Sequence, residues 1–389
     1  MSGLDAEDLR AAVAAGIVDD AQAARLSALA ERRATGAAAM GPTEERFELF
    51  RGLNDVLVTF GALILLVACA GFVAVAASFE DLGMETRWLL LGAILLPIAW
   101  VLSEGLVRGR RLVLPGILFC VVIAGCGWLV ATASVRLLAP GAPDATDLIA
   151  GFAGAATASA AFRWRFRLPF SLFVIAVASF PALAHVVASP NMVAVILTWE
   201  AVEVDIRPFI TGANGLNRDE LQQSVREAWF HLSALTFGFG IVCLMLAARC
   251  DMQDPLRLGR RSADGFWLHA AAGPALAAGL LRDHGLASSA GSPELGIILL
   301  AGAAFLLIAI VLDRRSLLLT AMVFVVMNVF GAALPDDESG LVGAGPGLAV
   351  LAGLGAGIVG LGLAWAVLRR RLLHALPGDA WKRRVPPAG

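Results

Sequence analysis

Long apolar blocks separated by short polar connections make up most of the chain beyond residue 50. A block of about 18 or more apolar residues matches the bilayer hydrocarbon layer, which is about 30 Å thick. The pattern therefore predicts an all-α, polytopic membrane helix bundle of about ten transmembrane helices. The predicted spans are 56–78, 88–107, 112–134, 146–162, 168–188, 230–248, 264–283, 293–312, 316–334 and 345–368.

The remaining segments predict the organisation around the bundle. Residues 1–43 form a cytoplasmic helical hairpin and joint, in which Gly16 ends one helix and Asp19 or Asp20 starts the next. The bundle occupies 44–371 with an external loop at 189–229, and 372–389 form a cytoplasmic basic tail. Within the loop, 191–199 is too short to cross and is either interfacial or re-entrant. Residues 218–229 are amphipathic and continue into the sixth span.

Charge sets the orientation of this bundle. The chain is 58% hydrophobic and only 16% charged, whereas soluble domains carry roughly a quarter charged residues. Its 30 lysines and arginines divide 24 to 6 between alternate connections. Because cytoplasmic loops carry the excess of Lys and Arg, both termini are predicted to be cytoplasmic.

Composition and motifs exclude several classes of protein. The five cysteines have no CxxC spacing, so neither a disulfide framework nor a cysteine metal site is predicted. His185, His231 and His284 lie near outer helix ends, but their spacing does not require a metal. No phosphate-binding loop, HExxH, GxSxG or CxxCH motif occurs, and no basic nucleic-acid surface is present. No cofactor or enzyme activity is predicted; the expected partners are the bilayer and a second membrane protein or another copy of the chain.

Few ionisable or amide side chains lie inside the predicted spans, and such residues are usually functional. The candidates for contact with a substrate are His269, Asn328, Glu104, Asn54 and Asp55. Each has a structural alternative. Asn54 and Asp55 suit the start of a helix, Glu104 suits a pair with Arg108, and the two deeper residues suit interhelical hydrogen bonds.

A ridge of small residues runs along the tenth span. Gly345, Ala349, Gly353 and Gly357 recur every four residues, a spacing that predicts a close-packing face for another helix. Gly151, Gly154 and Ala158 form a weaker face of the same kind in the fourth span.

Four segments carry a family resemblance: AAVAAGIVDDAQAARLSALAERR, LNDVLVTFG, DPLRLGRRSADGFWLH and LDRRSLLLTAMVF. The chain resembles a widespread group of predicted bacterial inner-membrane proteins of unknown function with a short helical cytoplasmic module. The resemblance implies a bacterial inner-membrane location and no particular activity. Relatives often carry a second His along the seventh span, where this chain reads Pro274-Ala-Leu-Ala-Ala-Gly279.

Two classes of function fit these features. A small-solute transporter or permease-like protein is favoured by ten spans, helices containing proline and a division into five and five. A non-transporting scaffold or regulatory protein is favoured by the small number of intramembrane charges and by the N-terminal module.

Overall fold

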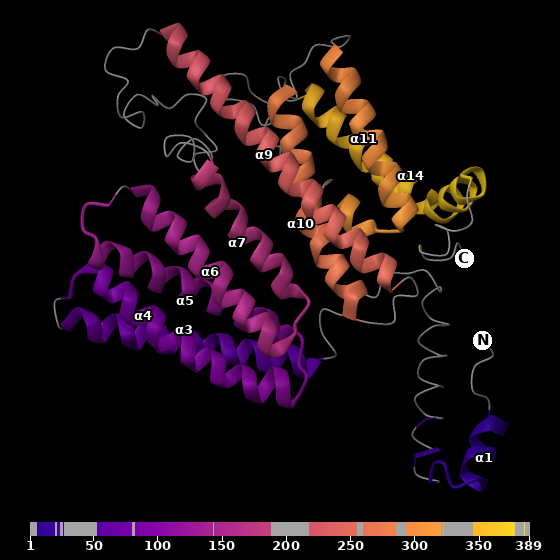
Figure 1. Ribbon diagram of the computed structural model, residues 1–389, viewed down its shortest axis with the longest axis horizontal. Coiled ribbons are helices and arrows are strands. Elements are labelled where there is room, and N and C mark those ends of the chain that lie inside the picture. Colours follow the sequence, from indigo (N-terminus) through magenta and orange to yellow (C-terminus); the bar gives the residue numbers. More distant parts are fainter. Residues whose placement is uncertain are drawn as a thin grey trace.

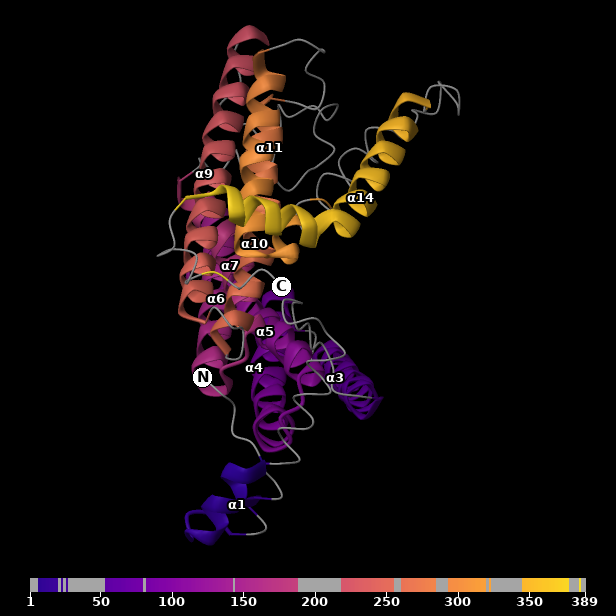
Figure 2. The same cartoon turned by 90° about the vertical axis from the view of Figure 1, so that its right-hand side faces the viewer.

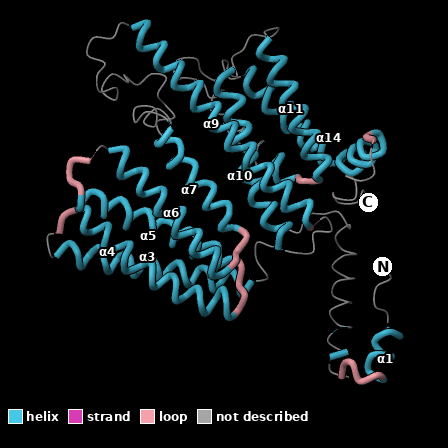
Figure 3. The backbone as a smooth tube through the Cα atoms, in the orientation of Figure 1, coloured by secondary structure: helices cyan, strands magenta, loops and turns pink. Residues whose placement is uncertain are grey.

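The computed structural model describes residues 6–19, 22–23, 26, 53–79, 82–142, 144–187, 218–254, 260–284, 293–319, 322, 345–377 and 385. Within these residues the regular structure is helical and no strand is present (Figure 3). The helices are α1 (Ala6–Ala14), α3 (Leu53–Phe79), α4 (Met84–Ser103), the π-helix η1 (Glu104–Gly109), α5 (Leu114–Leu138), α6 (Asp144–Phe166), α7 (Phe170–Val187), α9 (Arg218–Gln253), α10 (Arg260–His284), α11 (Pro293–Leu312) and α14 (Gly345–Ala375).

Five of the described helical segments are long and apolar enough to cross a membrane: Leu53–Phe79, Met84–Gly109, Leu114–Leu138, Ala145–Phe166 and Phe230–Gln253. Large apolar side chains remain exposed along α3, including Phe60, Ile64 and Phe72. A face of this kind is compatible with contact to lipid. The chain is thus an all-α membrane protein.

The described helices overlap the predicted spans, apart from the one at 316–334, which lies largely outside the described residues. α9 begins at Arg218, so the amphipathic segment 218–229 continues into its span as its pattern predicts. Segment 191–199 lies outside the described residues, and so does most of the predicted N-terminal hairpin. The predicted stop and restart are present, because Gly16 has a φ of +69° after α1 and Asp19 and Gln22 exchange backbone–side-chain hydrogen bonds.

The bundle is built from two groups of helices joined through α7 (Figures 1 and 2). In the first group α3, α4, α5, α6 and α7 pack in chain order, and their core includes Phe119, Ile123 and Phe162. In the second group α9 packs closely on α10, and α11 contacts α10 and α14. Its core includes Ala272, Leu276 and Leu317. Residues of α7 contribute to both cores, so this helix connects the two groups.

A close helix crossing lies between α5 and α6. A Cβ atom added to Gly127 would lie 2.6 Å from the Gly154 carbonyl oxygen, and one added to Gly154 would lie 2.5 Å from the Gly127 carbonyl oxygen. Only glycine allows the two backbones to approach this closely. The weaker of the two predicted small-residue faces is therefore a packed interface.

The stronger predicted face, on α14, is not packed against any described residue at Ala349, Gly353 or Gly357. Cβ atoms added to Gly353 or Gly357 would meet no described atom within 4 Å, and Ala349 is exposed. α14 instead uses Trp365 and Leu361, which lie further along the helix, to join the second core.

Three non-glycine residues in the described ranges have positive φ, and each lies in a connection between helices. Arg111 precedes α5, Arg167 precedes α7 and Asp313 follows α11, with φ of 56°, 54° and 53°. Asp313 ends α11 in a paired hydrogen-bond pattern, in which Asp313 N donates to Ile310 O and Arg314 N donates to Ala309 O. These tight turns bring many of the arginines to one end of the bundle, which we call the arginine end. It comprises the turns at 110–113, 167–169 and 313–314 and the adjoining ends of α9 and α10.

Candidate functional site

A buried carboxylate–guanidinium pair joins the end of α9 to the segment that follows α11. Asp251 and Arg314 are only 4% and 2% exposed. Arg314 Nε donates to Asp251 Oδ2 at 2.9 Å, and Arg314 Nη2 donates to Asp251 Oδ1. The same Nη2 donates to the backbone oxygen and to Oγ of Ser262, at 2.9 and 3.0 Å. Two parallel bonds from one guanidinium are the strongest way in which arginine holds a carboxylate.

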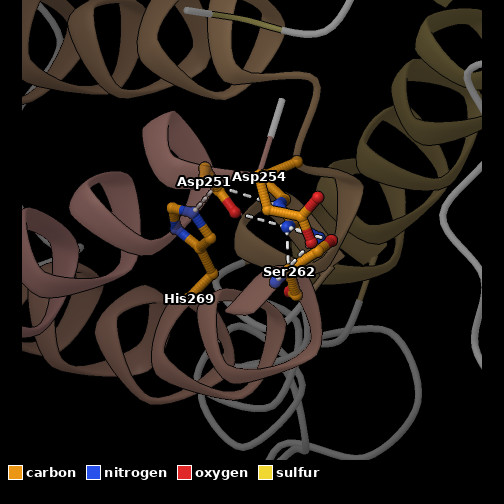
Figure 4. A network of polar contacts seen from close by, with 5 residues as sticks. Asp251, Asp254, Ser262 and His269 are labelled. Carbon is orange, nitrogen blue, oxygen red and sulfur yellow. Dashed lines mark hydrogen bonds and ion pairs between the residues drawn. The ribbon is translucent and has the colours of Figure 1, made fainter. Parts of the chain in front are cut away.

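His269 completes this group from α10. Its side chain is fully buried, and Nε2 lies 2.8 Å from Asp251 Oδ2 (Figure 4). An ionised carboxylate only accepts hydrogen bonds, so Nε2 carries the hydrogen and Nδ1 is left as an acceptor in the neutral ring. Nδ1 is buried and has no hydrogen-bond partner among the described residues. We call Asp251, Ser262, His269 and Arg314 the Asp251 network.

A glycine makes room for the network where α9 and α10 cross. A Cβ atom added to Gly265 would lie 2.5 Å from Asp251 Oδ1 and 3.3 Å from the backbone oxygen of Ala247. Helical side chains tilt toward the N-terminus of their helix. The ring of His269 therefore extends back toward the level of Gly265, where the carboxylate lies. Asp254 borders the network, since the backbone N of Ser262 donates to its Oδ2 at 3.4 Å.

Further ion pairs lie around the arginine end. Arg165 on α6 donates to Glu104 at 2.7 and 3.0 Å, and Glu104 also contacts Arg108 at 3.3 Å. Arg163 donates twice to Asp264 on α10, at 2.8 and 3.1 Å. This last pair links the two helix groups, as do the ring contacts that Trp267 makes with Phe170 and Phe173 of α7.

A second buried pair lies beside Arg314. Trp365 Nε1 donates to Asp313 Oδ1 at 2.7 Å, and Arg369 Nε lies 3.7 Å from the same oxygen. Asp313 and Arg369 are 2% and 3% exposed. The carboxylate of Asp313 thus joins the turn after α11 to the C-terminal part of α14.

The predicted site residues that the structure describes are not brought together. His269 lies in the Asp251 network, whereas Glu104 lies in η1 and pairs with Arg165 and Arg108. Asn54 is exposed and Asp55 is buried in the first turn of α3, a helix that packs on α4 and α5. Asn328 lies outside the described residues.

The predicted helix start at Asn54 is shifted in the structure. α3 begins at Leu53, so Asn54 lies inside the first turn instead of preceding it. Asp55 is the acidic residue of that turn, as the pattern predicts, and a carboxylate there complements the helix dipole.

Two of the three histidines considered as metal ligands, His185 and His231, have different neighbours. His185 is buried, its Nδ1 contacts the backbone oxygen of Pro181 and its ring lies beside Phe152. His231 is exposed and contacts Phe230. Within the described part of the chain, no three His, Cys, Asp or Glu side chains form a group that would hold a metal ion.

Sequence reasoning missed three members of the network. Arg314 was interpreted only as an orientation signal, although it is almost fully buried. Asp251 lies two residues after Arg249 and Ser262 directly follows Arg261, so both resemble residues of a polar connection. The available signal was local: a carboxylate at 251, three residues beyond the predicted end of the sixth span at 248, followed by a predicted span that contains His269.

Comparisons of the chain with protein-family models, with curated proteins and with solved structures found no match.

Proposed function

We propose that the protein is a transporter of a small solute in the bacterial inner membrane. In this proposal it has ten spans, both termini are cytoplasmic, and the arginine end faces the cytoplasm. The charge distribution between connections supports the orientation. The proposal includes membership of the family that the four quoted segments resemble.

The observation that carries the proposal is the buried Asp251 network. Burying an ion pair costs several kcal/mol per ion, and apolar replacements are often at least as stable. A buried acceptor without a partner costs about 1–3 kcal/mol more, and His269 Nδ1 is such an acceptor. A network that stability alone does not require, inside a membrane bundle, is best explained by contact with a solute.

The test compares the solutes on the two sides of the membrane. Cells that lack the protein are compared with cells producing the wild type, Asp251→Asn or the control Gly238→Ala, at equal abundance in the membrane. A Cβ at Gly238 meets nothing within 4 Å. Mass spectrometry of cell extract and medium should show one solute class redistributed by the wild type and the control only. Identical profiles in all strains would contradict a transport function.

A non-transporting scaffold is the second candidate, and the open face of α14 favours it. The small residues Ala349, Gly353 and Gly357 leave a backbone surface to which no described helix packs. Close approach of a helix from another chain would use such a surface. Under this alternative Gly357→Val abolishes association with a membrane partner, and Asp251→Asn leaves that association unchanged.

A further inference from the structure

Two neighbouring turns of the arginine end carry a concentration of arginines that the internal ion pairs do not neutralise. η1 and the turn after it contain Arg108, Arg110 and Arg111, and the end of α6 and the turn after it contain Arg165 and Arg167. Glu104 pairs with Arg108 and Arg165 and so brings the two groups together. Among the described residues, Glu104 is thus the one carboxylate that pairs with any of these five arginines.

The two turns also touch through their apolar residues. A Cβ atom added to Gly116 would lie 3.4 Å from side-chain atoms of both Val107 and Leu168. Val107 and Leu168 belong to the same core cluster. The arginines of the two turns thus belong to one surface, which we call the two-turn basic patch: Arg108, Arg110, Arg111, Arg165 and Arg167.

Three members of the patch have no partner in the described structure. Arg110, Arg111 and Arg167 are exposed, and the guanidinium group of none of them forms a hydrogen bond or an ion pair with a described residue. Their charges are therefore available to a ligand from outside the chain.

Backbone conformation makes two of these arginines unusual. Arg111 and Arg167 adopt the left-handed conformation, in which glycine or asparagine is favoured and a longer side chain is strained. Asp313 adopts the same conformation, and its carboxylate holds Trp365 and Arg369. Arg111 and Arg167 strain the backbone in the same way, but neither guanidinium group forms a hydrogen bond or ion pair with a described residue. A ligand from outside the chain that binds the two guanidinium groups accounts for the presence of arginine at these positions.

The patch lies at the membrane surface. One turn connects the candidate spans Met84–Gly109 and Leu114–Leu138, and the other connects the candidate span Ala145–Phe166 to the shorter apolar helix α7. A short turn between consecutive spans lies where hydrocarbon gives way to headgroups. Trp164 is 84% exposed and Val101 is 70% exposed beside the patch. An exposed tryptophan at this level is typical of the interface.

We infer that the two-turn basic patch binds the phosphate headgroup of an anionic phospholipid, with Arg111 and Arg167 as its principal contacts. Guanidinium groups hold phosphate oxygens in pairs, and the apolar side chains beside the patch lie along the acyl chains. This site is separate from the Asp251 network, and the inference does not depend on a transport function.

The test measures lipid binding and stability on the full chain. Wild type, Arg111→Gly/Arg167→Gly and the control Arg260→Gln are purified in neutral detergent. Arg260 is exposed and lies at the same end, outside the patch. Phosphatidylglycerol, phosphatidylcholine and inorganic phosphate are titrated in turn, with native mass spectrometry for bound lipid and thermal unfolding for stability.

We expect the wild type and Arg260→Gln to bind and be stabilised by phosphatidylglycerol in preference to phosphatidylcholine. A basic residue near an anionic surface contributes about 1 kcal/mol, or about fivefold in affinity, so the double variant should lose about 25-fold. Without lipid the double variant should unfold no earlier than the wild type, because glycine relieves the strain.

Three results would overturn the inference. The first is equal stabilisation by phosphatidylcholine. The second is equal stabilisation by inorganic phosphate, which would make the patch a site for a free anion. The third is a double variant that unfolds earlier without lipid and keeps its preference for phosphatidylglycerol, which would make both arginines structural.

Discussion

Gly265 and Asp251 show how closely the network depends on single atoms. The Asp251 carboxylate accepts hydrogen bonds from Arg314 and His269. It lies where a Cβ atom on Gly265 would otherwise be. The carboxylate must be held in this position for both hydrogen bonds to form, and glycine is the residue that allows it.

Replacing Gly265 by alanine should therefore displace the carboxylate. Overpacking of this kind costs about 1–3 kcal/mol. Gly238→Ala on α9 is the matched control, because nothing lies within 4 Å of its added Cβ, and it should be neutral or slightly stabilising. Unfolding of both variants in mixed micelles measures the difference. Equal stability of the two variants would mean that α9 and α10 separate freely at this point.

At the scale of elements, α7 and one ion pair hold the two helix groups together. Arg163 on α6 donates to Asp264 on α10, and its Nη1 also donates to the backbone oxygen of Leu168 at 3.3 Å. Arg163 therefore joins α10 to the turn at which α7 begins. The side chains are 28% and 14% exposed, so solvent screens the pair only in part.

A double-mutant cycle tests this link. Arg163→Gln, Asp264→Asn and the combined variant should show a coupling free energy of about 1 kcal/mol in unfolding measurements. The charge-swapped variant Arg163→Asp/Asp264→Arg should recover part of the loss. Additive effects, with no recovery in the swapped protein, would show that the pair does not hold the groups together.

The α5–α6 crossing gives a second prediction for packed elements. Gly154→Val places side-chain atoms against the Gly127 backbone and should destabilise the protein by about 3 kcal/mol. Gly357→Val on the open face of α14 should change stability by less than about 0.5 kcal/mol. The two melting temperatures give the comparison, and a larger loss at Gly357 would reverse the assignment of packed and open faces.

For the whole molecule, the predictable features are those that a single helix determines by itself. Long apolar blocks become helices because the bilayer offers the backbone no water, and a helix satisfies the backbone hydrogen bonds within a single segment. The restart at Asp19 and the continuation of 218–229 into α9 are likewise local patterns.

The Asp251 network could not be predicted in the same way. Asp251 and Arg314 are 63 residues apart, and their pairing depends on how α9, α10 and α11 pack. Arg314 also carries the same charge signal as the exposed arginines beside it. For the same reason the sequence ranked the α14 ridge above the α5–α6 face, because residue spacing does not reveal which helix lies opposite.

Topology is the whole-molecule prediction that the charge pattern makes. Reporter fusions after residues 140, 210 and 340 should all indicate the outer side of the membrane, because the segments that hold 24 of the 30 basic residues are predicted to face the cytoplasm. A cytoplasmic signal from any one of the three would require a different number of spans.

The most direct measurement of the central claim separates stability from function at the Asp251 network. Arg314→Met alone leaves a buried carboxylate without its guanidinium and should cost about 3–5 kcal/mol. Asp251→Leu/His269→Leu/Arg314→Met removes the ion pair and the imidazole of the network and leaves only Ser262, and apolar replacement of a buried ion pair is often neutral or stabilising. The account predicts that this triple variant accumulates in the membrane, unfolds no earlier than the wild type and gives the solute profile of cells that lack the protein. A triple variant that fails to fold, or one that folds and keeps the wild-type profile, would contradict it.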